Sequence, residues 1–284
     1  MRPVVPIGPR AAVSLALACV VGAMAFAWPL LVEPGAGLAH GTDAPLVFAL
    51  VLPLVIGIVV AEIGEGGLDA KALAMLGVLS ALGAVLRPLG AGTAGVETVF
   101  FLLVLGGRVF GPGFGFVQGA VTLFASALLT GGVGPWLPFQ MLGAAWVGLG
   151  AGLLPAARGR AEVAVLAAWA WVSSLLYGLA LNLSFWPFTL GPATQLSFVP
   201  GDPLAENLHR FLLFTLATSL GWDVGRAVTT TVLVVVVGPA VLAALRRAAR
   251  RAAFDAPVSF DDAGDEPLRQ PAAPPRSQPA GDQR

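Results

Sequence analysis

The stretch RVFGPGFGFVQGAVTLFASALLTGGVGPWLPFQMLGAAWVGLGAG, residues 108–152, decides the fold class of this 284-residue chain. Two apolar runs, at 113–131 and 138–154, flank a loop rich in glycine, with a tryptophan between two prolines. Each run approaches the roughly 20 residues that an α-helix needs to cross the hydrocarbon core of a bilayer. This arrangement is typical of a transporter's binding site rather than of an enzyme's active site.

The composition of the whole chain supports the same class. Hydrophobic residues make up 57% of the chain and charged residues 11%, which a single soluble core cannot accommodate. The formal net charge is zero, so no basic field favours nucleic acid. The one cysteine, Cys19, lies in an apolar run, and no Cys/His group has metal-ligand spacing, which predicts no metal and no other cofactor. We therefore expect an all-α integral membrane protein.

Hydropathy over windows of roughly 19 residues predicts eight membrane spans. They are 11–32, 45–63, 70–87, 94–110, 113–131, 138–154, 162–185 and 224–248. The first is too long for a cleavable signal peptide and is expected to be retained. A further helix at 205–220 is expected to lie on or dip into the outer surface, because Asn207, His209 and Arg210 would be costly in lipid.

The basic residues predict the orientation. With eight spans, most of them fall on one side, which places both termini in the cytoplasm. These residues are Arg2, Arg10, Lys71, Arg108, Arg158, Arg160, Arg246, Arg247, Arg250 and Arg251. Arg87, Arg210 and Arg226 are exceptions on the outer side. Residues 254–284, rich in proline, alanine and charge, are expected to form a disordered cytoplasmic tail.

Three outer segments, 87–97, 131–138 and 186–223, have a composition unlike that of lipid-facing sequence. Glycine lets backbone approach a ligand, and aromatic rings offer flat faces to a ring system. The candidate substrate-binding residues are Glu97, Trp136, Phe139, Gln140, Asn182, Trp186, His209, Trp222 and Asp223. Alternatives remain open: Trp222 could anchor the chain at the interface, Asp223 could cap the last helix, and Arg87 could pair with Glu97 across its loop.

Small residues at Ala70, Ala74, Gly77 and Ala81 recur every three or four positions on one face of the predicted third span. Such a face permits close docking of another helix, either from this chain or from a partner subunit. No Walker loop, HExxH, GxSxG or intramembrane carboxylate pair occurs, so the chain is not expected to be an enzyme.

The segments GPGFGFVQGAVTLFASALLTGGVGPWLPFQMLG and TSLGWDVGRA carry a resemblance to a known family. From about Ala70 to Arg251 the chain resembles the substrate-binding S component of an energy-coupling factor (ECF) transporter, and is most similar to the actinobacterial cobalamin-type group. The domains expected on this basis are a two-helix membrane extension (1–69), a six-helix substrate-binding core (70–253) and the tail (254–284).

The resemblance implies a plasma-membrane subunit that captures a vitamin or related micronutrient, such as a cobalamin-like compound, at its outer face. A transmembrane T component and two ABC ATPases would then release the substrate inside. The family builds its site from the first, third and fifth loops of the core, which correspond to the three outer segments. A small-residue face on the first core helix contacts the T component, which here corresponds to Ala70, Ala74, Gly77 and Ala81.

Two other functions fit the same sequence. A membrane scaffold or assembly protein would need only the small-residue face and the tail, and would retain no small molecule. An autonomous secondary permease would need ion coupling, for which the scarcity of intramembrane acidic residues offers no evident route.

Overall fold

A computed structural model describes residues 5, 8–31, 57, 70–90, 93–189, 194–199 and 201–252. All of them belong to the first of two compact units, Met1–Phe254. Their regular structure is helical, as expected for an all-α protein, and these residues contain no strand. The predicted span at 45–63, apart from Gly57, and the predicted tail, 254–284, lie outside the described residues.

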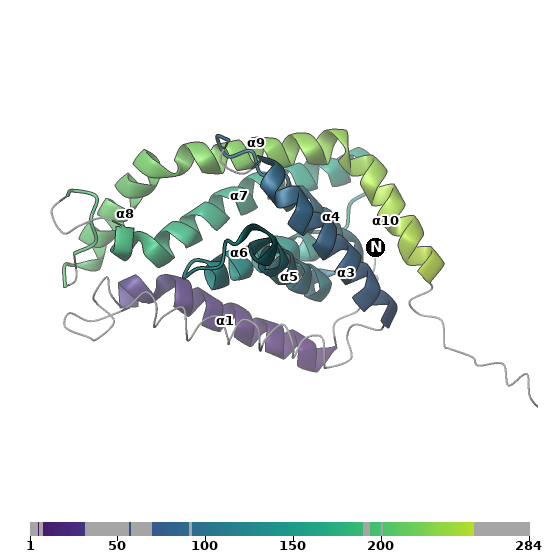
Figure 1. Ribbon diagram of the computed structural model, residues 1–284, viewed down its shortest axis with the longest axis horizontal. Helices are drawn as coiled ribbons and strands as arrows, with labels where there is room; N and C mark the ends of the chain where they lie inside the picture. Colours follow the sequence, from purple (N-terminus) through teal and green to yellow (C-terminus); the bar gives the residue numbers. More distant parts are fainter. Residues whose placement is uncertain are drawn as a thin grey trace, which may run out of the picture. The chain divides into compact units, whose positions relative to one another are not determined.

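The helices follow one another along the chain as shown in Figure 1. They are α1 (Pro9–Leu31), α3 (Ala70–Leu86), the 3-10 turn η2 (Arg87–Gly90), α4 (Val99–Phe110), α5 (Pro112–Thr130), α6 (Leu137–Leu153), α7 (Gly159–Thr189), α8 (Leu204–Thr218), α9 (Leu220–Val236) and α10 (Gly238–Ala252). Within the described part, three apolar segments are long enough to cross a membrane, Ala70–Gly90, Pro112–Thr130 and Gly159–Trp186. The bent pair α8 and α9 qualifies together as a fourth.

Helix α4 is shorter than the predicted span 94–110. Its 12 residues extend about 18 Å, against about 30 Å of hydrocarbon. The five residues before Thr98 form a turn instead, with positive φ at Ala94 (44°) and Gly95 (78°). The Thr98 hydroxyl donates to the carbonyl of Leu86 (2.7 Å) and fixes where the loop ends.

The opening stretch folds into α5 and α6, which pack against each other at the centre of Figure 1 and contact α4. Glycines make this contact possible. A Cβ on Gly107 or Gly115 would collide with the backbone of Gly148, and one on Gly148 would collide with Gly115. The three helices therefore approach one another through bare backbone, so the glycines of this stretch serve packing as well as the loop.

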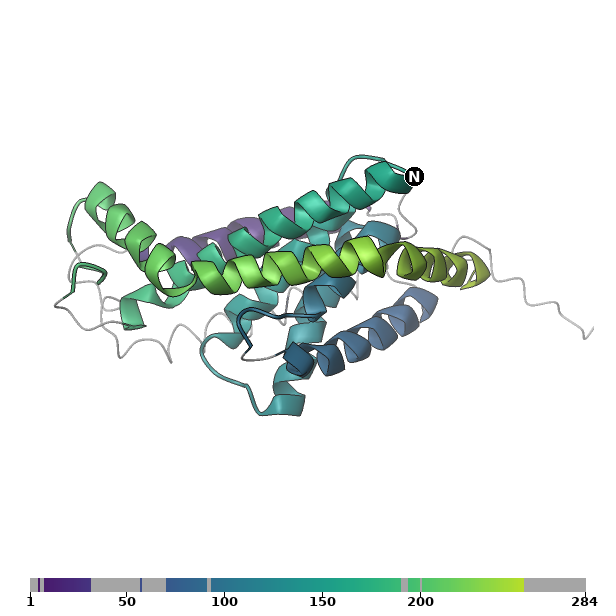
Figure 2. The same cartoon turned by 90° about the horizontal axis from the view of Figure 1, so that it is seen from above.

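Helices α7 and α9 run side by side in both views (Figures 1 and 2). Here the structure differs from the predicted single helix at 224–248, because the chain breaks at Val237 into α9 and α10. Pro239 cannot donate to a carbonyl one turn earlier, as a continuous helix would require, but it is tolerated in the first turn of α10. Helix α10 then buries Leu242 and Leu245 and packs against α4.

The predicted helix at 205–220 is present as α8, which is bent by 61° relative to α9. Two of its polar side chains are satisfied locally. The amide of buried Asn207 exchanges two hydrogen bonds with the backbone of Val199 (3.0 and 2.8 Å). Arg210 forms an ion pair with Asp202 (2.6 Å).

A buried carboxylate joins three elements at the end of the molecule where α4 finishes and α7 begins. Glu162 accepts from Arg108 of α4 (2.8 Å) and from Arg246 of α10 (2.6 Å). Arg108 also donates to the carbonyls of Leu154 and Pro155 in the turn between α6 and α7 (3.0 and 3.2 Å). We call this end the arginine end, because the elements that meet there also carry five exposed arginines. These are Arg158, Arg160, Arg247, Arg250 and Arg251.

The small-residue face of α3 is exposed. Ala70, Ala74, Gly77 and Ala81 are all accessible, and a Cβ on Gly77 would meet no atom within 4 Å. The opposite face, with Ala72, Leu76 and Leu79, is buried against the rest of the unit. In the described residues this face is therefore not used for internal packing.

Candidate functional site

A cavity of about 370 Å³ opens at the end of the helices opposite the arginine end. We call it the polar cavity. It is lined by Arg87, Pro88, Gly90, Gly95, Val96, Glu97, Ser126, Thr130, Gly132, Trp136, Gln140, Tyr177, Leu181, Trp222 and Arg226. The lining comes from the segment between α3 and α4, the end of α5, the turn after it and the first turn of α6, the middle of α7 and the start of α9. Sequence segments more than 100 residues apart thus meet in one hollow.

Two glycines hold the segment before α4 against α9. A Cβ on Gly95 would strike the backbone of Trp222, and a Cβ on Gly225 would strike the carbonyl of Ala94. Gly95 also has a positive φ, which other residues rarely adopt. This close approach brings Glu97, two residues further on, within ion-pairing distance of Arg226.

The floor of the polar cavity is built around Arg226. Its guanidinium donates through Nη1 to Asp223 Oδ1 (2.8 Å) and to the carbonyl of Ser174 (3.2 Å), and through Nη2 to Glu97 Oε1 (2.9 Å). The same group lies 4.8 Å from the ring centroid of Tyr177 and 5.3 Å from that of Phe100. Two carboxylates and two aromatic faces therefore compensate the burial of one cation.

The rim carries a second arginine and two indoles. Arg87 donates to the side-chain oxygen of Gln140 (3.0 Å), which links η2 to α6. The Trp136 indole N–H donates to the carbonyl of Gly132 (3.2 Å), so the ring is fixed although 51% of the residue is exposed. Trp222 is 45% exposed. Large aromatic rings left accessible beside a cavity offer flat faces for a planar ligand.

Of the residues predicted from sequence, the structure brings Glu97, Trp136, Gln140 and Trp222 together around the polar cavity. The expected pair between Arg87 and Glu97 does not form. Arg87 binds Gln140 and Glu97 binds Arg226, because the glycine contacts turn Glu97 toward α9.

Three other candidates lie near the cavity but do not line it. Asp223 is buried behind it, where its carboxylate accepts from Arg226 and Ser219 rather than capping α9. Asn182 donates to the hydroxyls of Ser219 and Thr215 and links α7 to the bend between α8 and α9. Phe139 faces α1, with its ring 5.3 Å from that of Phe26.

The remaining two candidates belong to α8 and its surroundings. Trp186 is fully buried against Phe211 and Phe214, and its indole donates to the carbonyl of Leu196 (2.6 Å). His209 is exposed on α8. Neither lines the polar cavity.

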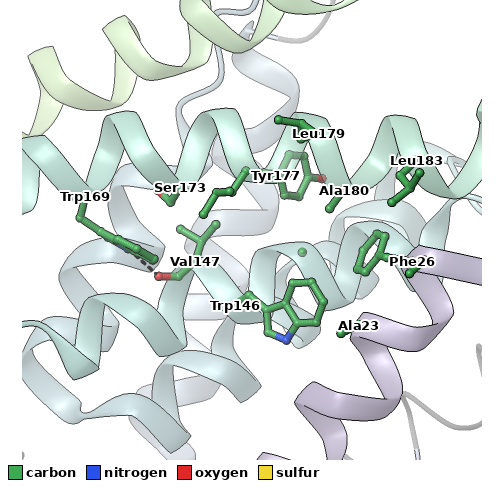
Figure 3. A pocket seen from close by; sticks show the side chains of 13 residues that line it. Ala23, Phe26, Trp146, Val147, Trp169, Ser173, Tyr177, Leu179, Ala180 and Leu183 are labelled. Atoms are coloured by element: carbon green, nitrogen blue, oxygen red, sulfur yellow. Dashed lines mark hydrogen bonds between the residues drawn. The ribbon is translucent and has the colours of Figure 1, made fainter. Parts of the chain in front are cut away.

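A second cavity of about 360 Å³ lies between α1, α6 and α7 (Figure 3). Its walls are apolar, with Phe26, Trp146 and Trp169 among the side chains that Figure 3 displays. The Trp169 indole is already bonded to the carbonyl of Val147 (3.0 Å). Tyr177 lines both cavities and separates them. Because the lining of this second cavity is almost wholly apolar and offers little to orient a hydrophilic ligand, we take the polar cavity as the candidate site.

Among the charged and aromatic lining residues, sequence reasoning missed three as ligand-site candidates, Arg87, Arg226 and Tyr177. A signal for two of them was present, since Arg87 and Arg226 break the bias of basic residues toward one side. Tyr177 sits in an apolar helix with nothing around it in sequence to distinguish it. Within the described part of the chain, no group of three or more His, Cys, Asp or Glu side chains could hold a metal ion.

Comparison with known proteins adds one match. The family model described as the substrate-specific component of ECF transporters matches residues 71–249, which extend from the start of α3 into α10. Searches of curated proteins and of solved structures gave no significant match.

Proposed function

Because the chain belongs to the family of ECF transporter substrate-specific components, we propose that it captures a small vitamin-like compound in the polar cavity for ATP-driven uptake. Proteins of this family are transport subunits of the plasma membrane rather than enzymes. The observation that carries the proposal is the convergence of Glu97, Trp136, Gln140 and Trp222 on one cavity.

The proposed orientation places the polar cavity outside and the arginine end in the cytoplasm. The distribution of arginine supports it, since Arg108, Arg246 and the exposed arginines gather at the end away from the cavity. Basic residues are enriched on the cytoplasmic side of membrane proteins.

The volume of the cavity limits the size of the substrate. Small-molecule sites usually measure about 300–1,000 Å³, and about 370 Å³ lies at the lower end of that range. A compound of one or two rings suits such a cavity better than a cobalamin-like macrocycle. We therefore propose a compact micronutrient as the substrate.

We further propose that the exposed face of Ala70, Ala74, Gly77 and Ala81 receives the transmembrane T component, which would act with two ABC ATPases. A membrane helix without side chains on one face lets a partner helix approach closely, and this face has no internal use in the described structure. A scaffold protein would share that face, but it would not need the polar cavity.

Native mass spectrometry of the detergent-purified chain tests the function directly. We expect a bound small molecule, which denaturing extraction would release for identification. A protein that stays free of ligand after extraction, and after addition of cobalamin and a panel of small vitamins, would count against uptake and for the scaffold.

A further inference from the structure

The charges lining the polar cavity are not equivalent. Three charged residues line it, Arg87, Glu97 and Arg226. Arg226 has its terminal nitrogens occupied by Asp223, Glu97 and a backbone carbonyl, and its unpartnered Nε is buried. It is therefore a structural cation with two counter-ions, and of its five N–H donors only the second on Nη2 is left for a ligand.

Arg87 is different. Among the described residues no carboxylate lies within ion-pairing distance of it, and the one hydrogen bond that its side chain makes goes to the uncharged amide of Gln140. A guanidinium has five N–H donors in a planar fork that fits two oxygens of a carboxylate or phosphate. Gln140 takes one donor and holds the fork at the cavity wall, which leaves the others for a ligand.

Glu97 offers the opposite chemistry. Its Oε1 accepts from Arg226, whereas Oε2 has no donor among the described residues and the side chain is 29% exposed. A free carboxylate oxygen accepts N–H or O–H donors. The cavity thus presents an available cation at Arg87 and an available acceptor at Glu97, with the indoles of Trp136 and Trp222 also in the lining.

We infer that the substrate is a compact planar heterocycle that carries an acidic oxyanion group, bound by Arg87, and an N–H or O–H donor edge that faces Glu97. This inference rests on the proposed function, because it assigns the ligand of the same cavity. Carboxylate and phosphate share the required chemistry, and the volume of about 370 Å³ restricts the ring system to one or two rings.

The test compares acids with their neutral counterparts by thermal stabilisation of the purified full-length chain. The probes are nicotinate against nicotinamide, and pyridoxal 5′-phosphate against pyridoxal. We expect the acidic member of at least one pair to bind at least about tenfold more tightly, an easily measured difference in affinity. Whether the carboxylate pair or the phosphate pair responds distinguishes the two sources of the oxyanion.

Variants of Arg87 test whether this residue causes the preference for acidic ligands. Arg87→Gln should abolish the preference for the acid, while Arg87→Lys should retain part of it because the charge remains but the fork is lost. Arg210→Gln is the matched control, because Arg210 lies on α8, pairs with Asp202 and does not line the cavity. This variant should bind acids as the wild type does.

The outcomes separate the two proposals. Equal binding of acids and neutral analogues, or an unchanged preference in Arg87→Gln, would overturn the inference and leave the transport function standing. The inference would also be overturned, with the transport function left standing, if a neutral compound were extracted from the protein and Arg87→Gln bound it as tightly as the wild type does. No small-molecule binding in any assay would overturn the proposed function and the inference with it.

Discussion

The carboxylate of Asp223 on α9 occupies the space that a side chain at Gly178 of α7 would need, because a Cβ at position 178 would collide with both carboxylate oxygens. The absence of a side chain at Gly178 thus makes room for the ion pair between Asp223 and Arg226 at the floor of the cavity. A glycine in the middle of a long helix is therefore part of the construction of the site.

Gly178→Ala should displace Asp223 and destabilise the protein. Breaking a buried ion pair costs about 3–5 kcal/mol, and alanine recovers about 1 kcal/mol of helix propensity, so we expect a net loss of at least about 2 kcal/mol. Thermal unfolding in detergent measures it. Gly221→Ala on α9 is the control, since a Cβ there meets no atom within 4 Å. Equal stability of the two variants would contradict the steric role of Gly178.

Glu162→Gln should loosen the arginine end. The substitution removes the counter-ion of Arg108, whose side chain is 7% exposed, and of Arg246, which is 23% exposed. We expect a loss of about 3–5 kcal/mol, because a cation is left buried and unpaired. Glu206→Gln, at an exposed position in the first turn of α8, is the control. If both variants unfold at the same temperature, the cluster does not stabilise the fold.

Gly148→Ala should separate α6 from α5. Its Cβ would meet the backbone of Gly115, which cannot move as a flexible side chain would. Overpacking of this kind costs about 1–3 kcal/mol, and we expect a lower unfolding temperature and poorer recovery from the membrane. Gly77→Ala, whose Cβ would point into open space, should behave as the wild type in the isolated subunit. A wild-type unfolding temperature for Gly148→Ala would argue against close helix contact.

Gly77→Leu should weaken association with the T component without affecting the ligand. A leucine on the exposed small-residue face keeps the partner helix at a distance, whereas the polar cavity is lined by other residues. Co-purification of the T component reports the first effect, and ligand binding by the isolated chain reports the second. Val235→Leu on the exposed face of α9 is the control. Undiminished co-purification would show that the partner docks elsewhere.

Trp136→Ala should weaken ligand binding. Loss of an aromatic stacking partner removes about 0.5–1.5 kcal/mol beyond the buried area, which corresponds to a roughly 2- to 13-fold rise in Kd. Calorimetry with the ligand identified by extraction measures the change. His209→Ala, on the exposed surface of α8, should leave Kd unchanged. An unaltered Kd for Trp136→Ala would remove this indole from the binding site.

The sequence predicted the helical membrane fold, and it singled out part of the lining of the candidate site, for identifiable reasons. Apolar runs of membrane length have few structural alternatives, and Trp136 and Gln140 stood out because they bracket a proline-rich entry into α6. Trp186 carried the same aromatic signal, yet it fills the core beneath α8. Composition alone cannot distinguish an aromatic side chain that packs against its own fold from one that lines a cavity.

Other features depended on contacts between distant segments. The first part of the predicted span 94–110 is a loop because Gly95 and Gly225 allow its backbone to approach α9, which no local hydropathy window detects. Arg226 appeared only as an exception to the charge bias. Its role required knowledge that Glu97, 129 positions earlier, faces it in space.

The short α4 has a consequence for how water reaches the site. Its 12 residues extend about 18 Å, less than a hydrocarbon layer of about 30 Å, and at the cavity end the loop before Thr98 takes the place of further helical turns. Loop backbone at membrane depth is tolerated where it lines a water-filled cavity, and this loop contributes Gly95, Val96 and Glu97 to the polar cavity. In the proposed orientation a hydrophilic substrate would therefore reach Arg87 and Glu97 through water, and the crossing of the hydrocarbon layer would be left to the energised step.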